Sequence, residues 1–319
     1  MSLAVNRSQI ESTLGLFDAG YRHFLYETPL FKLPGKALGI DCAEVWLKLE
    51  QLQTSGSFKA RGMLNRLISN TIPRSGVIVA SGGNAGIATA AAAKLLGVHC
   101  EVFVPTISSS AKQARLKALD AHLQVTGNAY AQALAACLER QMQTGALLAH
   151  AYDQEEAVIG AGTLAAEIDR QSGSAPDAIL VSVGGGGLIA GIAAWYAHTA
   201  TRVVALEPEL APTLYAARAA GEPVDVSVSG IAADALGAKR IGDIAWRLTQ
   251  QHVRASLLIS DESIRAAQLW LWKHLQIAAE PSAALGLAAL QTGAYQPKKD
   301  ERVCLVICGA NMDLATLIV

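Results

Sequence analysis

Short apolar runs alternate with long alanine-rich stretches from about residue 76 onward, and this alternation constrains the fold most strongly. The apolar runs are rich in β-branched residues and do not alternate with polar ones, which is typical of strands buried on both faces. We expect strands at residues 76–80, 100–105, 122–127, 178–183, 202–208 and 302–309. We expect helices at residues 84–97, 110–121, 129–145 and 154–173. This order predicts an α/β protein with doubly wound parallel sheets.

The expected strands fall into two sets, one near residues 76–127 and one from residue 178 onward. A chain of 319 residues is long for a single core, and two subdomains are the default at this length. We expect a large domain of residues 1–52 plus 155–319, with a small domain of residues 53–154 inserted in it. Because parallel sheets bind ligands at the carboxyl ends of their strands, the cleft between the domains is the expected ligand site.

The charges give no sign of a nucleic-acid or membrane partner. The formal net charge is −1, with 26 basic and 27 acidic residues spread along the chain, so no basic face is expected. No apolar stretch is long enough to span a membrane, and no basic segment leads into an apolar one at the N-terminus. We therefore expect a cytoplasmic protein. The five cysteines and seven histidines show neither a disulfide framework nor zinc-ligand spacing.

Three loops follow expected strands and carry glycine or polar residues. They are SGGNAG (81–86), GGGG (184–187) and CGAN (308–311). Consecutive glycines let several N–H groups turn toward one anion, and the helix N-terminus behind them also favours phosphate. The second loop also fits a dinucleotide fingerprint, formed by Gly185, Gly187, Ala190 and Glu207. The loop alone therefore leaves a dinucleotide and another phosphate compound open.

The segment TSGSFKARGM (54–63) places a lysine, Lys59, behind small hydroxyl residues and a phenylalanine. In the simplest interpretation Thr54, Ser55 or Ser57 caps a helix, and Lys59 is a solvated residue of its first turn. This interpretation needs no ligand.

A single cofactor would explain Lys59 together with the polar residues of the three loops. Pyridoxal phosphate needs a lysine amine for its aldehyde, a nest of N–H groups for its phosphate, a donor to its ring oxygen and a partner for its ring nitrogen. Lys59, the glycine run, Asn84 and Cys308 could supply these in that order. A dinucleotide would predict nothing at Lys59, Asn84 or Cys308.

Five segments, in order along the chain, carry a specific resemblance. They are KLEQLQTSGSFKARG (48–62), SGGNAGIATAAAAKLLGV (81–98), SVGGGGLIAG (182–191), AAEPSAALGLAAL (278–290) and LVICGAN (305–311). Together they resemble the serine/threonine dehydratase family, whose members have the tryptophan-synthase-β-like fold of fold-type II pyridoxal-phosphate enzymes. The resemblance implies that the cofactor lies in the cleft between two domains.

The resemblance also implies a role for each residue of the site. Lys59 is the catalytic residue and forms the internal Schiff base, Phe58 packs on the ring and Asn84 bonds the ring oxygen. The implied cofactor-binding set is Phe58, Lys59, Asn84, Gly184, Gly185, Gly186, Gly187, Ala235 and Cys308. The implied substrate-binding set is Ser81, Gly82, Asn84 and Ala85.

A structural cation is a further implication of the resemblance. The family's cation ligands correspond to Glu207, the backbone of Ala211 and Thr213. Relatives that take magnesium have an aspartate six residues after the glutamate, where this chain has Thr213. Since a hydroxyl suits a loosely held monovalent ion better than a strict octahedral one, we expect potassium or sodium.

The implied reaction is the dehydration and deamination of a small β-hydroxy α-amino acid, such as L-serine or L-threonine, to a 2-oxo acid and ammonia. Lys59 would act as the general base at Cα. A homodimer is also expected. An amino-acid racemase stays an alternative, although racemases of this fold have a serine where this chain has Gly82. A β-replacement enzyme, a dinucleotide-dependent oxidoreductase and a catalytically silent binding protein are more remote. Gly82 and Ala85 are small, which predicts room near the reacting carbon and a relaxed substrate preference.

Overall fold

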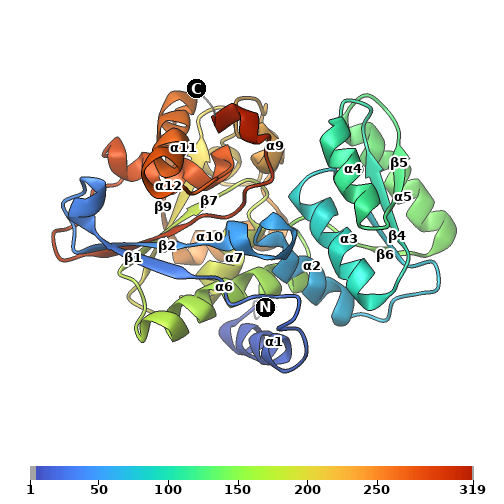
Figure 1. Ribbon diagram of the computed structural model, residues 1–319, viewed down its shortest axis with the longest axis horizontal. Helices are drawn as coiled ribbons and strands as arrows, with labels where there is room; N and C mark the ends of the chain where they lie inside the picture. The colour runs from blue at the N-terminus through green and yellow to red at the C-terminus, as the bar shows by residue number, and fades with distance from the viewer. Residues whose placement is uncertain (1–4, 318–319) are drawn as a thin grey trace.

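The computed structural model describes residues 5–317, which form two bodies that lie side by side (Figure 1). The larger body contains a six-stranded sheet in the order β1-β2-β10-β7-β8-β9. Its strands are β1 (Leu30–Pro34), β2 (Glu44–Lys48), β7 (Ala178–Ser182), β8 (Arg202–Pro208), β9 (Val253–Ile259) and β10 (Arg302–Val306). The smaller body contains a four-stranded sheet in the order β5-β4-β3-β6. Its strands are β3 (Val77–Ala80), β4 (Cys100–Val104), β5 (His122–Val125) and β6 (Leu147–Leu148).

Helices cover both sheets. The smaller sheet packs with α3 (Asn84–Leu96), α4 (Ser110–Ala118) and α5 (Tyr130–Thr144). The larger body contains α1 (Arg7–Gly20), α6 (Glu155–Ser172), α7 (Gly187–Trp195), α8 (Thr213–Ala220), α9 (Ala233–Leu236), α10 (Asp243–His252), α11 (Asp261–Leu275) and α12 (Pro281–Gln291). Short 3-10 helices lie at η1 (Gly35–Leu38), η2 (Glu50–Leu52), η3 (Thr54–Gly56) and η4 (Leu314–Leu317).

The α/β fold with parallel sheets is confirmed, with one correction to the larger sheet. All six expected strands and all four expected helices are present, to within a few residues at their ends. However, β1 pairs with β2 in the antiparallel direction, so this sheet is mixed rather than wholly parallel. The expected strands also omitted β1, β2, β6 and β9. β1 and β9 are partly exposed along their length and β6 has only two residues, so none of these three has the continuous apolar run of a buried parallel strand.

Helix α2 (Lys59–Ile68) lies between the two bodies and packs against α6 on one side and α3 on the other (Figure 1). Gly62 allows this close approach, because a Cβ atom at this position would lie 2.6 Å from the carbonyl oxygen of Ala157 on α6. The first residue of α2 is Lys59. The packing of this helix therefore determines where the lysine points.

A buried network of charged groups fixes the first turn of α2. The guanidinium of Arg61 donates hydrogen bonds to both oxygens of Glu50 (2.7 and 2.8 Å) and to both oxygens of Glu167 (2.7 and 3.0 Å). A further bond reaches Thr163 (3.2 Å), so all five N–H donors of the arginine have a partner. Lys48 donates to Glu167 at 2.9 Å. The four charged side chains are at most 2% exposed, and their formal charges cancel.

Candidate active site

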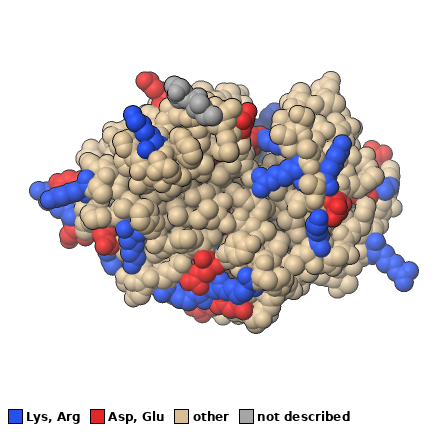
Figure 2. Space-filling model, in the orientation of Figure 1, with Lys and Arg blue, Asp and Glu red and all other residues tan. Residues whose placement is uncertain are grey.

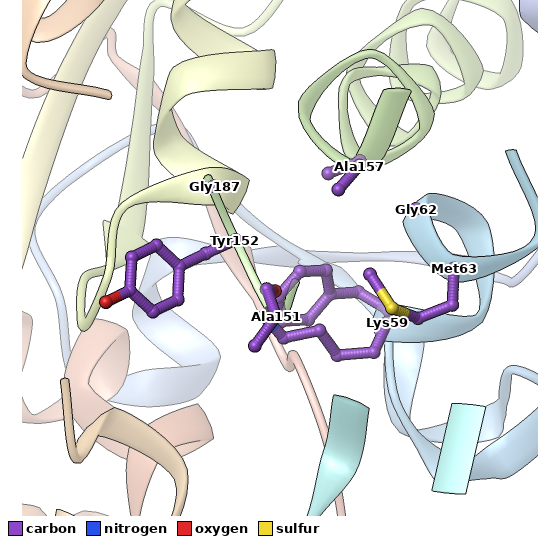
Figure 3. A pocket seen from close by; sticks show the side chains of 9 residues that line it. Lys59, Gly62, Met63, Ala151, Tyr152, Ala157 and Gly187 are labelled. Carbon is purple, nitrogen blue, oxygen red and sulfur yellow. Dashed lines mark hydrogen bonds between the residues drawn. The ribbon is translucent and has the colours of Figure 1, made fainter. Parts of the chain in front are cut away.

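Lys59 points from the start of α2 toward the glycine-rich loop before α7. Its Nζ donates a hydrogen bond to the carbonyl oxygen of Ala151. The amine shares a cavity of about 10 Å³ with Phe58, Met63, Tyr152 and Gly187, among others, which is room for about one water molecule. Figure 3 shows the side chain of Lys59 extending toward Ala151, with Tyr152 near Gly187.

The environment of Lys59 favours the neutral amine. Burial lowers its pKa from 10.5 to about 8, while Cys308 and Glu280 partly oppose this shift. The charged form is disfavoured because the stem lies against apolar side chains. An amine with this pKa is partly neutral at physiological pH, as a nucleophile or a general base requires. The interpretation of Lys59 as a solvated first-turn residue is therefore wrong.

The segment that leads to Lys59 runs beside the loop after β10. Ser57 bridges to Gly309 in the antiparallel direction, and the N–H of Phe58 donates to the carbonyl oxygen of Cys308 at 3.0 Å. The Cys308 thiol is buried, and burial raises its pKa to about 12. A neutral thiol therefore lies beside the lysine.

Asn84, the first residue of α3, belongs to a partly buried polar cluster with the loop after β10. Its amide donates to both carboxylate oxygens of Glu280, at 2.9 and 3.2 Å, and its oxygen accepts a bond from Asn311 at 2.6 Å. Glu280 also accepts a bond from Ser282 at 2.7 Å, and the Ser282 hydroxyl lies 3.6 Å from the Cys308 sulfur. One carboxylate thus connects the residues expected at the ring oxygen and at the ring nitrogen. Glu280 is the N-cap of α12, and it was not among the residues expected to form the site.

The four glycines from Gly184 to Gly187 form the loop between β7 and α7. At Gly185 a Cβ atom would lie 2.3 Å from the ring of Tyr152, and Gly186 has a φ of 89°, where other residues are strained. The loop needs glycine because Tyr152 packs on it, and the same tight turn leaves N–H groups at the start of α7. Sequence reasoning gave Tyr152 no role.

Helix α9 borders the same loop. A Cβ atom at Gly184 would lie 2.9 Å from Cα of Leu236, and one at Gly83 would lie 3.8 Å from the carbonyl oxygen of Asp234. Ala235 therefore lies between the glycine loop and the loop before α3. Lys112 of α4 forms an ion pair with Asp234 across the notch between the two bodies, and the notch is visible in Figure 2.

The loop before α3 holds the expected substrate-binding residues. The Ser81 hydroxyl accepts a bond from the N–H of Gly83 at 3.3 Å, and Ala85 is buried in the first turn of α3. A Cβ atom at Gly82 would lie 3.1 Å from Val104 and 3.3 Å from Ser108. There is therefore less free space beside Gly82 than the absence of a side chain suggests.

Glu207 ends up behind the glycine loop. Its carboxylate accepts bonds from the backbone N–H groups of Leu214 and Tyr215, at 2.7 and 2.8 Å, and from the hydroxyl of Ser256 at 2.7 Å. Thr213 lies 3.1 Å from the same carboxylate and donates to the carbonyl oxygen of Gly184 at 2.6 Å. Glu207 thus supports the loop from within instead of facing the cleft, which disfavours a role in binding a ribose.

Comparison with known proteins agrees with this geometry. The model of the pyridoxal-phosphate dependent enzyme family matches residues 21–309. The chain belongs to this family.

Two curated relatives within the family are named after the same kind of reaction. The chain is 31% identical to an L-threonine ammonia-lyase of Thermotoga maritima over 85% of this chain and 68% of the relative. It is 37% identical to a biosynthetic L-threonine dehydratase of Mycobacterium bovis over 86% of this chain and 66% of the relative. The chain therefore spans about two thirds of the length of these curated relatives.

Solved structures of the family have the same fold. Maize serine racemase superposes with a TM-score of 0.90 at 28% identity and covers 99% of this chain and 96% of that one. Serine racemase from Dictyostelium discoideum superposes with a TM-score of 0.86 at 27% identity, over 97% and 99% of the two chains. A threonine deaminase structure superposes with a TM-score of 0.88 at 28% identity. These are fold-type II enzymes, which confirms the expected fold class.

The residues present fit the family's cofactor. Pairwise contacts link the five separate segments that carry Lys59, Asn84, the glycine loop, Ala235 and Cys308. Ser57, directly before Phe58, has a buried hydroxyl without a hydrogen-bond partner among the described residues. Such an unsatisfied group is uncommon in a folded protein, and a ligand bound beside it would supply its partner.

Proposed function

We propose that this protein is an ammonia-lyase that converts a small β-hydroxy α-amino acid, such as L-serine or L-threonine, to a 2-oxo acid and ammonia. The observation that carries the proposal is the partly buried Lys59 side chain, whose amine has a pKa lowered to about 8, between the glycine loop and the polar cluster of Asn84. The names of the curated relatives, which are threonine ammonia-lyases and dehydratases, support the same reaction. Pyridoxal phosphate, when bound, withdraws electrons from Cα of the amino acid and so makes its proton easier to remove.

Residues of the chain perform the remaining steps, which are proton removal and the binding of substrate and cofactor. The neutral amine of Lys59 takes the proton from Cα. The N–H groups at the start of α3 hold the substrate carboxylate, because a helix N-terminus favours an anion. The N–H groups of the glycine loop at the start of α7 would hold the cofactor phosphate for the same reason. Asn84 would donate to the ring oxygen with an amide N–H that faces Glu280 in this structure, and Phe58 would pack against the ring.

Cys308 favours elimination over transamination. Because burial raises the pKa of its thiol to about 12, the group beside the ring nitrogen carries no charge at physiological pH. A neutral partner stabilises a protonated pyridine less than a carboxylate does. Cys308 would then make a bound cofactor a weaker electron sink, which would favour prompt loss of the β-hydroxyl.

A racemase is the second candidate, since maize serine racemase superposes closely. Racemisation needs a second acid–base group on the face of the substrate opposite Lys59. Gly82, which takes the place of the racemase serine, offers no such group. This supports elimination as the main reaction.

The test is an assay of the purified protein with added pyridoxal phosphate on L-serine and L-threonine. We expect a 2-oxo acid and ammonia in equal amounts, with little D-serine, and none of these products from Lys59→Ala. The matched variant Gly82→Ser should raise the ratio of D-serine to 2-oxo acid. D-serine as the main wild-type product would contradict the assignment, as would 2-oxo acid formation at the wild-type rate by Lys59→Ala.

The relaxed substrate preference stays a prediction, and the structure weakens its original reason. An added methyl at Gly82 would meet Val104 and Ser108, so this glycine supports the shape of the loop at least as much as it makes room. Comparison of kcat/KM for serine, threonine and 3-phenylserine in wild type and Gly82→Ala tests it. A clear wild-type preference for serine that the methyl leaves unchanged would exclude the relaxed pocket.

The division into residues 53–154 and the remainder is also proposed, and the two sheets support it. The homodimer and the cytoplasmic location stay predictions. The described residues include no helix that is long and apolar enough to span a membrane. The proposed reaction includes no bound cation, because the oxygen atoms expected to bind potassium or sodium already take part in hydrogen bonds.

A further inference from the structure

Glu207, at the carboxyl end of β8, has no free acceptor position. An ionised carboxylate offers about four lone-pair sites. One oxygen faces the N–H of Leu214 (2.7 Å) and the hydroxyl of Thr213 (3.1 Å), and the other faces the N–H of Tyr215 (2.8 Å) and the hydroxyl of Ser256 (2.7 Å). Each oxygen thus has two partners from the protein itself. The side chain is fully buried.

The other two groups of the expected cation site are engaged as well. The carbonyl oxygen of Ala211 accepts a bond from the N–H of Thr213 at 3.2 Å. The single hydroxyl proton of Thr213 lies between the carbonyl oxygen of Gly184 (2.6 Å) and Glu207 (3.1 Å), which is a three-centre hydrogen bond. The residues therefore do not fit the family's structural cation.

We propose that hydrogen bonds replace the cation in this protein, and that Thr213 is a positioning residue that ties the phosphate-binding loop to Glu207. The connection runs from the carboxylate of Glu207 through the Thr213 hydroxyl to Gly184, the first residue of the loop. Ser256 of β9 holds the other oxygen of Glu207 from the neighbouring strand. The protein then needs no potassium, sodium or magnesium.

The charge balance around Glu207 and Thr213 explains why a threonine at position 213 allows hydrogen bonds to replace the cation. With Thr213 the cluster has one negative charge, and the N-terminal N–H groups of α8 stabilise it. An aspartate at position 213 would place a second carboxylate about 3 Å from the first. Two carboxylates at that distance repel each other and require a cation or a shared proton. The presence of a hydroxyl thus removes the reason for the ion.

The first experiment measures the melting temperature of the cofactor-loaded wild-type protein after treatment with EDTA as its choline salt and exhaustive dialysis into a choline buffer without metal ions. Potassium, sodium and magnesium chloride are compared with choline chloride at equal ionic strength. We expect the same melting temperature in all four salts to within about 1 °C. A specific rise of more than about 2 °C with any of the three metal ions would overturn the proposal. The readout needs no turnover, so it is independent of the proposed reaction.

The second experiment uses variants of one position. Thr213→Asp should gain a dependence on magnesium, with a rise of about 4 °C in melting temperature when magnesium is about 100 times its Kd. Thr213→Val, which removes the hydroxyl, should bind pyridoxal phosphate about three- to tenfold more weakly, whereas Thr213→Ser should bind it like wild type. No magnesium response in Thr213→Asp would refute the charge argument, and wild-type cofactor affinity in Thr213→Val would refute the positioning role.

Discussion

Replacement of Arg61 by methionine tests whether the buried charge network holds the first turn of α2. Methionine fills much of the same space but leaves Glu50 and Glu167 without the guanidinium that satisfies both of them. Loss of one partner from a fully buried ion pair costs about 3–5 kcal/mol. Because unfolding entropy is about 2.1 cal/mol/K per residue, a chain of 319 residues should lose about 4–8 °C in melting temperature.

Arg170 provides a matched control on the surface. It also binds two carboxylates, Asp18 at 2.7 Å and Glu27 at 2.6 Å, but its side chain is 38% exposed and theirs are 36% and 35% exposed. Exposed pairs contribute about 0–1 kcal/mol, so Arg170→Met should lower the melting temperature by no more than about 1–2 °C. The assay is thermal unfolding by circular dichroism at pH 7, with both variants and wild type saturated with cofactor.

The pH dependence of the stability lost in Arg61→Met gives a second check. Arg61 and Lys48 outweigh burial and lower the pKa of Glu167 to about 2. A carboxylate with a depressed pKa stabilises the fold above its unfolded pKa and loses this effect as pH falls through its folded pKa. The cost of Arg61→Met should therefore shrink between about pH 5 and pH 2. The reasoning is refuted if Arg61→Met costs no more than Arg170→Met, or if its cost is the same at pH 3 as at pH 7.

Three further variants test the site. Gly185→Ala should weaken pyridoxal-phosphate binding at least tenfold, because the added methyl would lie 2.3 Å from the Tyr152 ring. Adding Tyr152→Ala to this variant should restore part of the lost affinity. Equilibrium titration with the cofactor measures both effects, and no recovery in the double variant would contradict the contact between Gly185 and Tyr152. Ser282→Ala removes a hydroxyl that is bonded to Glu280 and lies close to Cys308. The free energy of unfolding, measured by chemical denaturation, should fall by about 1–2 kcal/mol, and the absorbance spectrum of the bound cofactor should change. An unchanged spectrum would contradict the connection from Glu280 through Ser282 to Cys308. Burial lowers the pKa of Lys59 to about 8. The free energy of unfolding of the cofactor-free protein should therefore rise between about pH 8 and pH 10.5, and Lys59→Met should not show this rise. If the free energy of unfolding changes with pH in the same way in both proteins, the pKa shift of Lys59 is excluded.

The fold was predictable wherever burial leaves a continuous apolar run. The strand at 178–182 is buried at every residue, and its sequence shows this directly. β9 is half-exposed along most of its length, and its mixed sequence resembles a loop. β1 pairs with β2 in the antiparallel direction, and no local sequence pattern predicts the direction in which two strands pair.

The site was predictable where a residue type has a specific chemical use. Lys59 and the glycine run stand out because few roles require them. The polar residues behind them do not, since their partners are distant in sequence. Arg61 and Glu167 are 106 residues apart, and Asn84 and Glu280 are 196 residues apart. Only the folded chain shows that Thr213 supports Gly184.

Covalent trapping tests the central claim most directly, namely that Lys59 carries the cofactor. The protein is loaded with pyridoxal phosphate, reduced with borohydride, digested and mapped by mass spectrometry. Lys48, which belongs to the charged network that fixes the start of α2, is fully buried and donates to Thr28, Glu167 and Gln171, so it has no proton free and serves as the internal control. We expect one modified peptide, which contains Lys59, and no modification of Lys59→Ala. Modification at another lysine, or none at saturating cofactor, would contradict the account.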